Sequence, residues 1–163
     1  MYDFPERVEE NLMASIENYS KKPAIAITMG DPAGIGSEVA VRALNMDCIF
    51  KRCRPFVIGD ANAVVDALEM IGSTASVRTV HSVKDIDPES HIINVLDLEN
   101  LDYSSIIHGQ VSEAAGRASV EWVLEAGRLA TNNQIDAIVT APINKEACQL
   151  AGYKDIGHME LFQ

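Results

Sequence analysis

The sequence predicts an α/β fold in which a parallel sheet is layered with helices. From residue 24 onward, apolar runs of strand length alternate with segments of helical periodicity. Two of these runs end in corners that carry glycine or polar side chains, as strand-to-helix turns of α/β proteins do. The first run alternates little between apolar and polar residues, which is typical of a strand buried on both faces of a sheet.

Residues 1–22 are expected to form a helical extension that precedes the α/β domain of residues 23–163. Within the extension, Val8, Leu12 and Ile16 fall on one stripe at helical spacing. We therefore expect this helix to lie on the domain or on a partner subunit.

The remaining elements follow from periodicity and turn residues. Trp122 is expected in the core, because it lies on the apolar stripe of a long helical segment. Gly116 and Gly127 weaken that segment as an isolated helix, so another backbone is expected to approach them. Further strands are expected at 55–60, 76–80, 91–96 and 135–141, and helices at 38–44, 61–71 and 111–131.

The composition excludes several classes of protein. The chain has 163 residues, of which 47% are hydrophobic and 23% charged, as expected for one soluble domain with a core. Its net charge of −11 argues against a nucleic-acid partner. No apolar run reaches the roughly 18 residues of a membrane span, and no signal peptide is recognised. Its three cysteines lack metal-binding spacing, which favours free thiols in the cytoplasm.

The first corner follows the apolar run that begins at residue 24. Gly30, Asp31, Gly34 and Gly36 lie in a turn whose glycines let a ligand approach the main chain. Ser37 is expected to cap the following helix, whose free amides favour an anion. The spacing matches neither the dinucleotide fingerprint nor the phosphate-loop motif. A tight turn without a ligand explains the same residues equally well.

The second corner follows the run at 135–141. Thr140, Asn144 and Lys145 bring a hydroxyl, an amide and an ammonium group to one strand-to-helix turn. Lys145 offers a point charge to a phosphate or carboxylate, and Asn144 an orienting hydrogen bond. An exposed lysine without a role in the first helical turn is the competing interpretation.

A histidine close to the end of the chain is a candidate metal ligand. His158 follows a glycine, but one histidine cannot hold zinc, and a hydrogen-bonded structural histidine is the alternative. The other histidines, His81, His91 and His108, lack ligand spacing. The alternation of strands and helices stops at Gln163 without a closing turn, so we expect an incomplete domain.

Three segments, taken together and in this order, resemble the N-terminal half of the PdxA family. This family comprises the 4-hydroxythreonine-4-phosphate dehydrogenases and relatives that act on D-threonate and D-erythronate 4-phosphates. The resemblance spans about residues 23–163. It is carried by residues 27–36 (ITMGDPAGIG), 109–117 (GQVSEAAGR), and 140–147 (TAPINKEA) with 157–161 (GHMEL).

The resemblance implies a fold like that of isocitrate and isopropylmalate dehydrogenases, in a homodimer whose active site lies at the subunit interface. It also implies NAD or NADP as cofactor, and a divalent metal (zinc, cobalt or magnesium) held by three histidines. His158 matches the first of the three. Asn144 and Lys145 match positions that contact substrate, with Thr140 beside them. Ser37, Gln110 and Met159 depart from the residues usual in the family.

The function that the resemblance implies is oxidation, with decarboxylation, of a four-carbon hydroxy-acid phosphate such as 4-hydroxythreonine 4-phosphate. Lys145 and Asn144 would orient the substrate anion or the enolate oxygen, while the glycine corner shapes the cleft. This polypeptide alone is expected to be inactive. A stand-alone module that binds a phosphorylated metabolite without catalysis is the alternative, and a purely structural protein would leave residues 140–145 without a role.

Overall fold

The computed structural model describes residues 22–86, 89–154, 157 and 161. The predicted helical extension, apart from Lys22, and the candidate ligand His158 lie outside these residues. The strands are β1 (Ala24–Thr28), β2 (Arg54–Ile58), β3 (Ser76–Val80), β4 (Ile92–Leu96) and β5 (Ala137–Thr140). The helices are α2 (Gly36–Leu44), α3 (Asp47–Phe50), α4 (Ala61–Met70), α5 (Glu113–Thr131) and α6 (Lys145–Leu150), with 3-10 turns η1 (Val83–Asp85) and η2 (Tyr103–Ser105).

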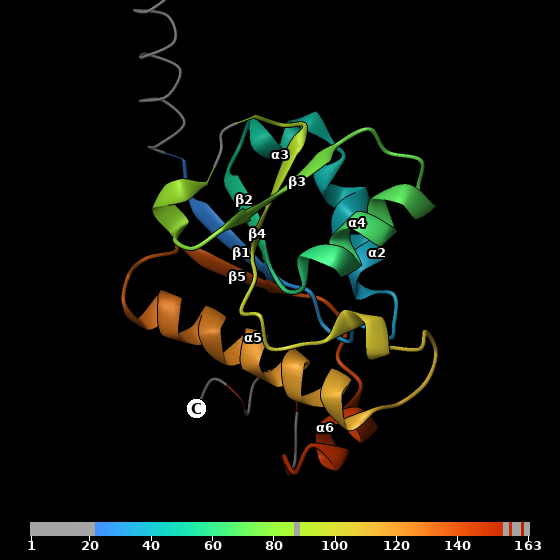
Figure 1. Ribbon diagram of the computed structural model, residues 1–163. Helices are drawn as coiled ribbons and strands as arrows, with labels where there is room; N and C mark the ends of the chain where they lie inside the picture. The colour runs from blue at the N-terminus through green and yellow to red at the C-terminus, as the bar shows by residue number, and fades with distance from the viewer. Residues whose placement is uncertain (1–21, 87–88, 155–156, 158–160, 162–163) are drawn as a thin grey trace, which may run out of the picture.

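The described strands form one parallel sheet in the order β3-β4-β2-β1-β5, which confirms the predicted α/β class. Helices α2 and α4 lie on one face of the sheet, and α5 with α6 lies on the other (Figure 1). The chain leaves β1 toward β2 but returns to the opposite side of β1 as β5. The carboxyl ends of β1 and β5 therefore flank a topological switch point, where open α/β sheets place their ligands.

The sheet is less evenly buried than the apolar runs suggest. In β1, residues 24, 26 and 28 are buried, while Ile25 and Ile27 are only half-buried, so burial on both faces is incomplete. In β5, Val139 is 51% exposed. The physical reason is that β5 pairs only with β1 and is an edge strand among the described elements.

The core lies between the sheet and its two helical layers. Trp122 on α5 is completely buried, as predicted from its helical stripe. Gly116 on the same helix also behaves as predicted, because a Cβ there would clash with the backbone of Ala147 in α6. The cysteines are free thiols, as expected. In the part of the chain that the structure covers, no helix is both long and apolar enough to cross a membrane.

Candidate functional site

The two corners predicted from the sequence lie side by side at the switch point. Thr28 at the end of β1 is paired in register with Thr140 at the end of β5. Just beyond these strands, the amide of Asp31 donates a 2.9 Å hydrogen bond to the carbonyl oxygen of Pro142. Gly30, with φ of +75°, leaves no room for a Cβ against the Pro142 carbonyl. A glycine is therefore required where the two loops meet.

One pocket of about 460 Å³ opens between these loops. Four of the candidate site residues border it, two from each corner. Gly30 and Gly36 instead allow close backbone packing, and Thr140 ends β5 without lining the pocket. The lining residues are Asp31, Gly34, Ile35, Pro142, Ile143, Asn144 and Lys145.

The glycine corner leads into α2 earlier than the sequence predicts. The helix begins at Gly36, and its N-cap residue Ile35 makes no side-chain capping bond. The prediction that Ser37 caps this helix is wrong, because Ser37 is buried within the first turn. The local side-chain hydrogen bond comes from Asp31, whose Oδ1 accepts from the amide of Ala33 at 2.9 Å.

The glycine corner is held by two further segments that sequence reasoning missed. The buried Ser119 hydroxyl of α5 is shared between the carbonyl oxygens of Gly30 (3.0 Å) and Ala115 (2.7 Å). The amide of Gly109 donates to the carbonyl of Ala33 at 2.8 Å. A serine on the apolar stripe of a helix is the one sequence signal of such a bond, since a buried hydroxyl needs a partner.

The second corner presents an amide and an ammonium group. Asn144 caps α6, with Oδ1 accepting from the amides of Glu146 (3.0 Å) and Ala147 (3.2 Å). Its Nδ2 has no hydrogen-bond partner among the described residues. Lys145 is exposed, and it forms no ion pair or hydrogen bond with any residue that the structure describes. With respect to the described part of the chain, both groups are therefore available to a ligand.

Helix α6, which follows the second corner, carries a buried thiol. Cys148 lies against α5, and its Sγ donates to the carbonyl oxygen of Gly116 at 3.9 Å. Burial, and secondly the nearby carboxylate of Asp31, raise the pKa of the Cys148 thiol. Cys148 is therefore a neutral packing residue rather than a nucleophile.

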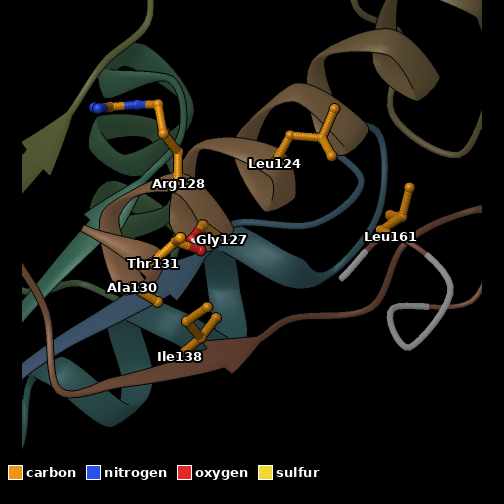
Figure 2. Close-up of a pocket in the computed structure, with 7 residues that line it drawn as sticks. All are labelled: Leu124, Gly127, Arg128, Ala130, Thr131, Ile138 and Leu161. Carbon is orange, nitrogen blue, oxygen red and sulfur yellow. Dashed lines mark hydrogen bonds between the residues drawn. The ribbon is translucent and has the colours of Figure 1, made fainter. Parts of the chain in front are cut away.

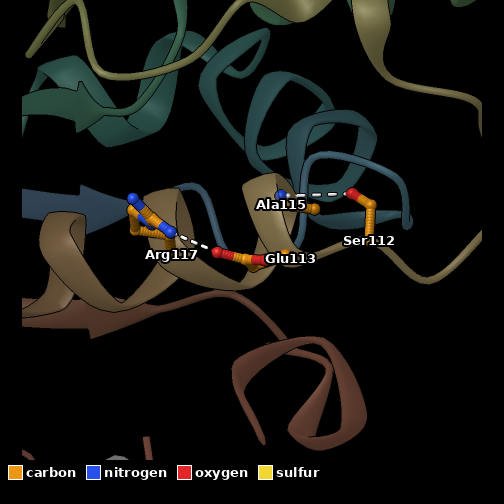
Figure 3. A network of polar contacts seen from close by, with 4 residues as sticks. All are labelled: Ser112, Glu113, Ala115 and Arg117. Atoms are coloured by element: carbon orange, nitrogen blue, oxygen red, sulfur yellow. Dashed lines mark hydrogen bonds and ion pairs between the residues drawn. The ribbon is translucent and has the colours of Figure 1, made fainter. Parts of the chain in front are cut away.

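The start of α5 carries the middle segment of the predicted resemblance. Ser112 caps the helix by accepting from the amide of Ala115 at 3.2 Å, and Arg117 pairs with Glu113 (Figure 3). These two charged side chains border a hollow of about 380 Å³. Because Arg117 already has an anionic partner, its guanidinium is less available to a further anion than the ammonium of Lys145, which has no partner among the described residues.

A third pocket of about 450 Å³ lies between α5 and β5, away from both corners. Leu124, Ile138 and Leu161 line it together with residues of the last turns of α5 (Figure 2). It is largely apolar and contains none of the candidate site residues.

A metal site does not form within the part of the chain that the structure covers. No group of three or more His, Cys, Asp or Glu side chains there could hold a metal ion. His91 pairs with Glu89, and His108 lies 3.0 Å from the Tyr103 hydroxyl. The predicted ligand His158 is outside the described residues, so its role stays a prediction.

The fold and the pocket place the chain among α/β proteins whose candidate ligand pocket lies at the switch point of a parallel sheet. The family described as "Pyridoxal phosphate biosynthetic protein PdxA" matches residues 51–163. The chain belongs to this family, as the resemblance predicted.

Individual relatives agree with this assignment. The chain is 40% identical to a 4-hydroxythreonine-4-phosphate dehydrogenase of Trichlorobacter lovleyi, over 86% of this chain and 42% of the relative. It is 37% identical to a Halalkalibacterium halodurans protein provisionally named D-threonate 4-phosphate dehydrogenase, over 87% of this chain and 42% of the relative. A crystal structure of a 4-hydroxythreonine-4-phosphate dehydrogenase from Burkholderia phymatum matches with a TM-score of 0.82 and 38% identity. That match covers 86% of this chain and 42% of the other. The chain thus spans about 42% of the length of these relatives.

Proposed function

We propose that this chain contributes to the metal-dependent, NAD(P)-linked oxidation and decarboxylation of a four-carbon hydroxy-acid phosphate. The names of its relatives, which refer to 4-hydroxythreonine 4-phosphate and D-threonate 4-phosphate, support this substrate class. The observation that carries the proposal is the pocket at the switch point, where Asn144 and Lys145 stand opposite the glycine corner.

In this proposal Lys145 is the catalytic residue of the chain and Asn144 its partner in binding. The Lys145 ammonium holds an anionic oxygen of the substrate, and later the enolate oxygen that decarboxylation produces. Since Oδ1 of Asn144 accepts from two amides in capping α6, its Nδ2 is the group left to bind the ligand, as a donor. The cap therefore fixes the direction of that donor.

The cofactors remain part of the proposal. NAD or NADP would supply the hydride acceptor and a divalent metal would stabilise the enolate. The described residues do not fit a complete metal site, so we derive no step through the metal. His158 is proposed as one ligand on the resemblance alone. Because one histidine cannot hold the metal alone, the test is made in a complete enzyme that contains this segment. There, His158→Ala should lower the amount of divalent metal retained after dialysis, and unchanged retention would refute the ligand role.

The test of the proposed site is calorimetric binding of 4-hydroxythreonine 4-phosphate and D-threonate 4-phosphate to the chain. Losing a charge-assisted hydrogen bond costs about 1.5–3 kcal/mol, so Lys145→Gln should weaken binding roughly ten- to hundredfold. Lys154→Gln, an exposed lysine beyond α6, is the matched control and should bind as the wild type does. Equal affinity in the Lys145 variant and the wild type would refute the site.

A kinetic assay separates the enzyme from a simple binding module. We propose that the chain alone forms no NADH or NADPH when it is supplied with the phosphate ester, a divalent metal and NAD or NADP. Binding of the ester that is equally tight with and without metal and cofactor would favour the binding module instead. Turnover by the isolated chain would contradict the proposed inactivity.

We further propose that the chain assembles as a homodimer, as the family resemblance implies. Sedimentation equilibrium should give a molecular mass twice that of the 163-residue chain. A mass equal to one chain at every concentration would reject this part of the proposal.

A further inference from the structure

The carboxylate of Asp31 is the one acidic group on the wall of the switch-point pocket within the described residues. The residue is only 9% exposed, although acidic residues usually lie in solvent. A buried carboxylate is costly unless hydrogen-bond donors or a cation accompany it. We therefore ask which oxygen of the Asp31 carboxylate has a hydrogen-bond donor and which has none.

The position of Asp31 is fixed from three directions. Its amide donates to Pro142, its carbonyl oxygen accepts from the amide of Gly34 at 3.0 Å, and its Oδ1 accepts from the amide of Ala33. These bonds hold both the backbone and one oxygen of the carboxylate. The orientation of the other oxygen, Oδ2, is thereby set before any ligand binds.

Oδ2 of Asp31 has no hydrogen-bond donor and no cation within the part of the chain that the structure covers. It lies next to Gly34, which also borders the pocket, at 3.6 Å from the place where a Cβ would stand. A carboxylate accepts hydrogen bonds and cannot donate them. A group that pairs with Oδ2 must therefore supply a hydrogen-bond donor or a positive charge.

We propose that Asp31 is a specificity-determining residue whose Oδ2 accepts a hydrogen bond from a hydroxyl group of the substrate. This inference rests on the proposed function, and it adds a second anchor to the one at Lys145. Opposite charges on the two loops orient the ligand, with its anionic group at Lys145 and its hydroxyl at Asp31. A phosphorylated acid without that hydroxyl would leave Oδ2 unpaired and bind less well.

The test is the affinity ratio between a hydroxylated ligand and its deoxy analogue, measured by calorimetry on the full chain. The probes are D-threonate 4-phosphate and 4-phosphooxybutyrate, which lacks both hydroxyls. The wild type should prefer the hydroxylated ligand roughly ten- to hundredfold. Asp31→Asn keeps Oδ1 for the Ala33 amide but replaces the charged acceptor Oδ2 with a neutral donor. A hydroxyl can still accept from that donor, but the bond is no longer charge-assisted, so the preference should fall.

Several results would overturn the proposed role of Asp31. If Asp31→Asn keeps the wild-type ratio, or if the wild type itself does not discriminate, the role of Asp31 is overturned. The wild-type measurement holds even if the variant does not fold. If homoserine phosphate, which carries an amine at C2 and no free hydroxyl, alone depends on Asp31, an ammonium is the partner and the hydroxyl assignment is wrong. If the wild type binds none of the three phosphates, the proposed function fails, and the role of Asp31 with it.

Discussion

Gly116 of α5 and Ala147 of α6 approach so closely that a Cβ on Gly116 would overlap the carbonyl group of Ala147 and lie 2.6 Å from the amide nitrogen of Cys148. The neighbouring atoms belong to a backbone, which cannot move aside as a flexible side chain can. Helix α6 starts at Lys145 and is capped by Asn144, so this contact also sets where those two side chains lie.

Gly116→Ala should therefore lower the free energy of unfolding and displace α6. Overpacking of a close contact costs about 1–3 kcal/mol, which exceeds the helix-propensity gain of about 1 kcal/mol from replacing glycine. Urea unfolding followed by circular dichroism measures the difference. The control is Ala114→Leu, which enlarges an exposed side chain of the same helix and should change stability little. A Gly116→Ala variant as stable as the wild type would contradict the packing argument.

The two functions of Asn144 can be separated by two substitutions. Asn144→Ala removes the cap from the amides of Glu146 and Ala147 and should cost about 1 kcal/mol of stability. Asn144→Asp keeps the capping oxygen and should retain stability, but it replaces the Nδ2 donor with a second anionic oxygen. Phosphate-ester affinity should fall in both variants, measured by calorimetry beside thermal unfolding. Unchanged affinity in Asn144→Asp would leave Asn144 with a structural role only.

How much of this site could be foreseen depends on the range of the interactions. The two corners could be located from local patterns, since apolar runs end in Gly30 and precede Asn144. The hydrogen bond between Asp31 and Pro142 could not, because it requires β1 and β5 to be neighbours although they are far apart in sequence. Strand order is decided by packing of the whole sheet rather than by local propensity.

Helix caps are also hard to assign from the sequence, although their hydrogen bonds join residues that are close in the chain. Ser37 has the residue type of a cap, but the turn at Asp31 brings the chain into helix one residue before it. Asn144, which the sequence predicts as a ligand-binding residue, is the N-cap of α6 in the structure. The residue type identifies a hydrogen-bonding group, whereas the backbone direction decides which amide it meets.

Asp60 is a buried carboxylate whose charge should reduce stability at neutral pH. Burial raises the pKa of Asp60, and Asp97 adds repulsion, although the amide of Ala63 opposes the shift by donating to Oδ1 at 2.9 Å. A pKa raised by folding means that the contribution of this group to stability is complete below the unfolded value of 3.8 and is lost as the pH rises through the folded pKa.

Asp60→Asn should therefore be more stable than the wild type at neutral pH, because the amide oxygen can still accept from Ala63. The gain should disappear as the pH falls below about 4, where the wild-type carboxyl is protonated too. Urea unfolding at several pH values measures the difference in free energy of unfolding between the variant and the wild type. Asp85→Asn, at an exposed position in η1, is the control for removing one negative charge. A gap that is constant with pH would rule out the buried charge as its cause.

Tyr103 should weaken the fold in alkaline solution. Burial, followed by the nearby charge and hydrogen bond of Asp66, raises the pKa of the Tyr103 hydroxyl from 10.0 to about 12. The unfolded chain then loses this proton first, so the stability that the neutral hydroxyl provides is complete below pH 10 and is lost as the pH rises toward 12.

Tyr103→Phe removes the titrating group, together with the 3.0 Å contact to Nε2 of His108. At neutral pH the variant should be less stable by about 0.5–1.5 kcal/mol. This gap should narrow between pH 10 and 12 in urea unfolding, and the absorbance titration should lose a tyrosinate signal near pH 12. If the difference in free energy of unfolding between the variant and the wild type is constant across that range, burial and Asp66 do not keep the hydroxyl neutral.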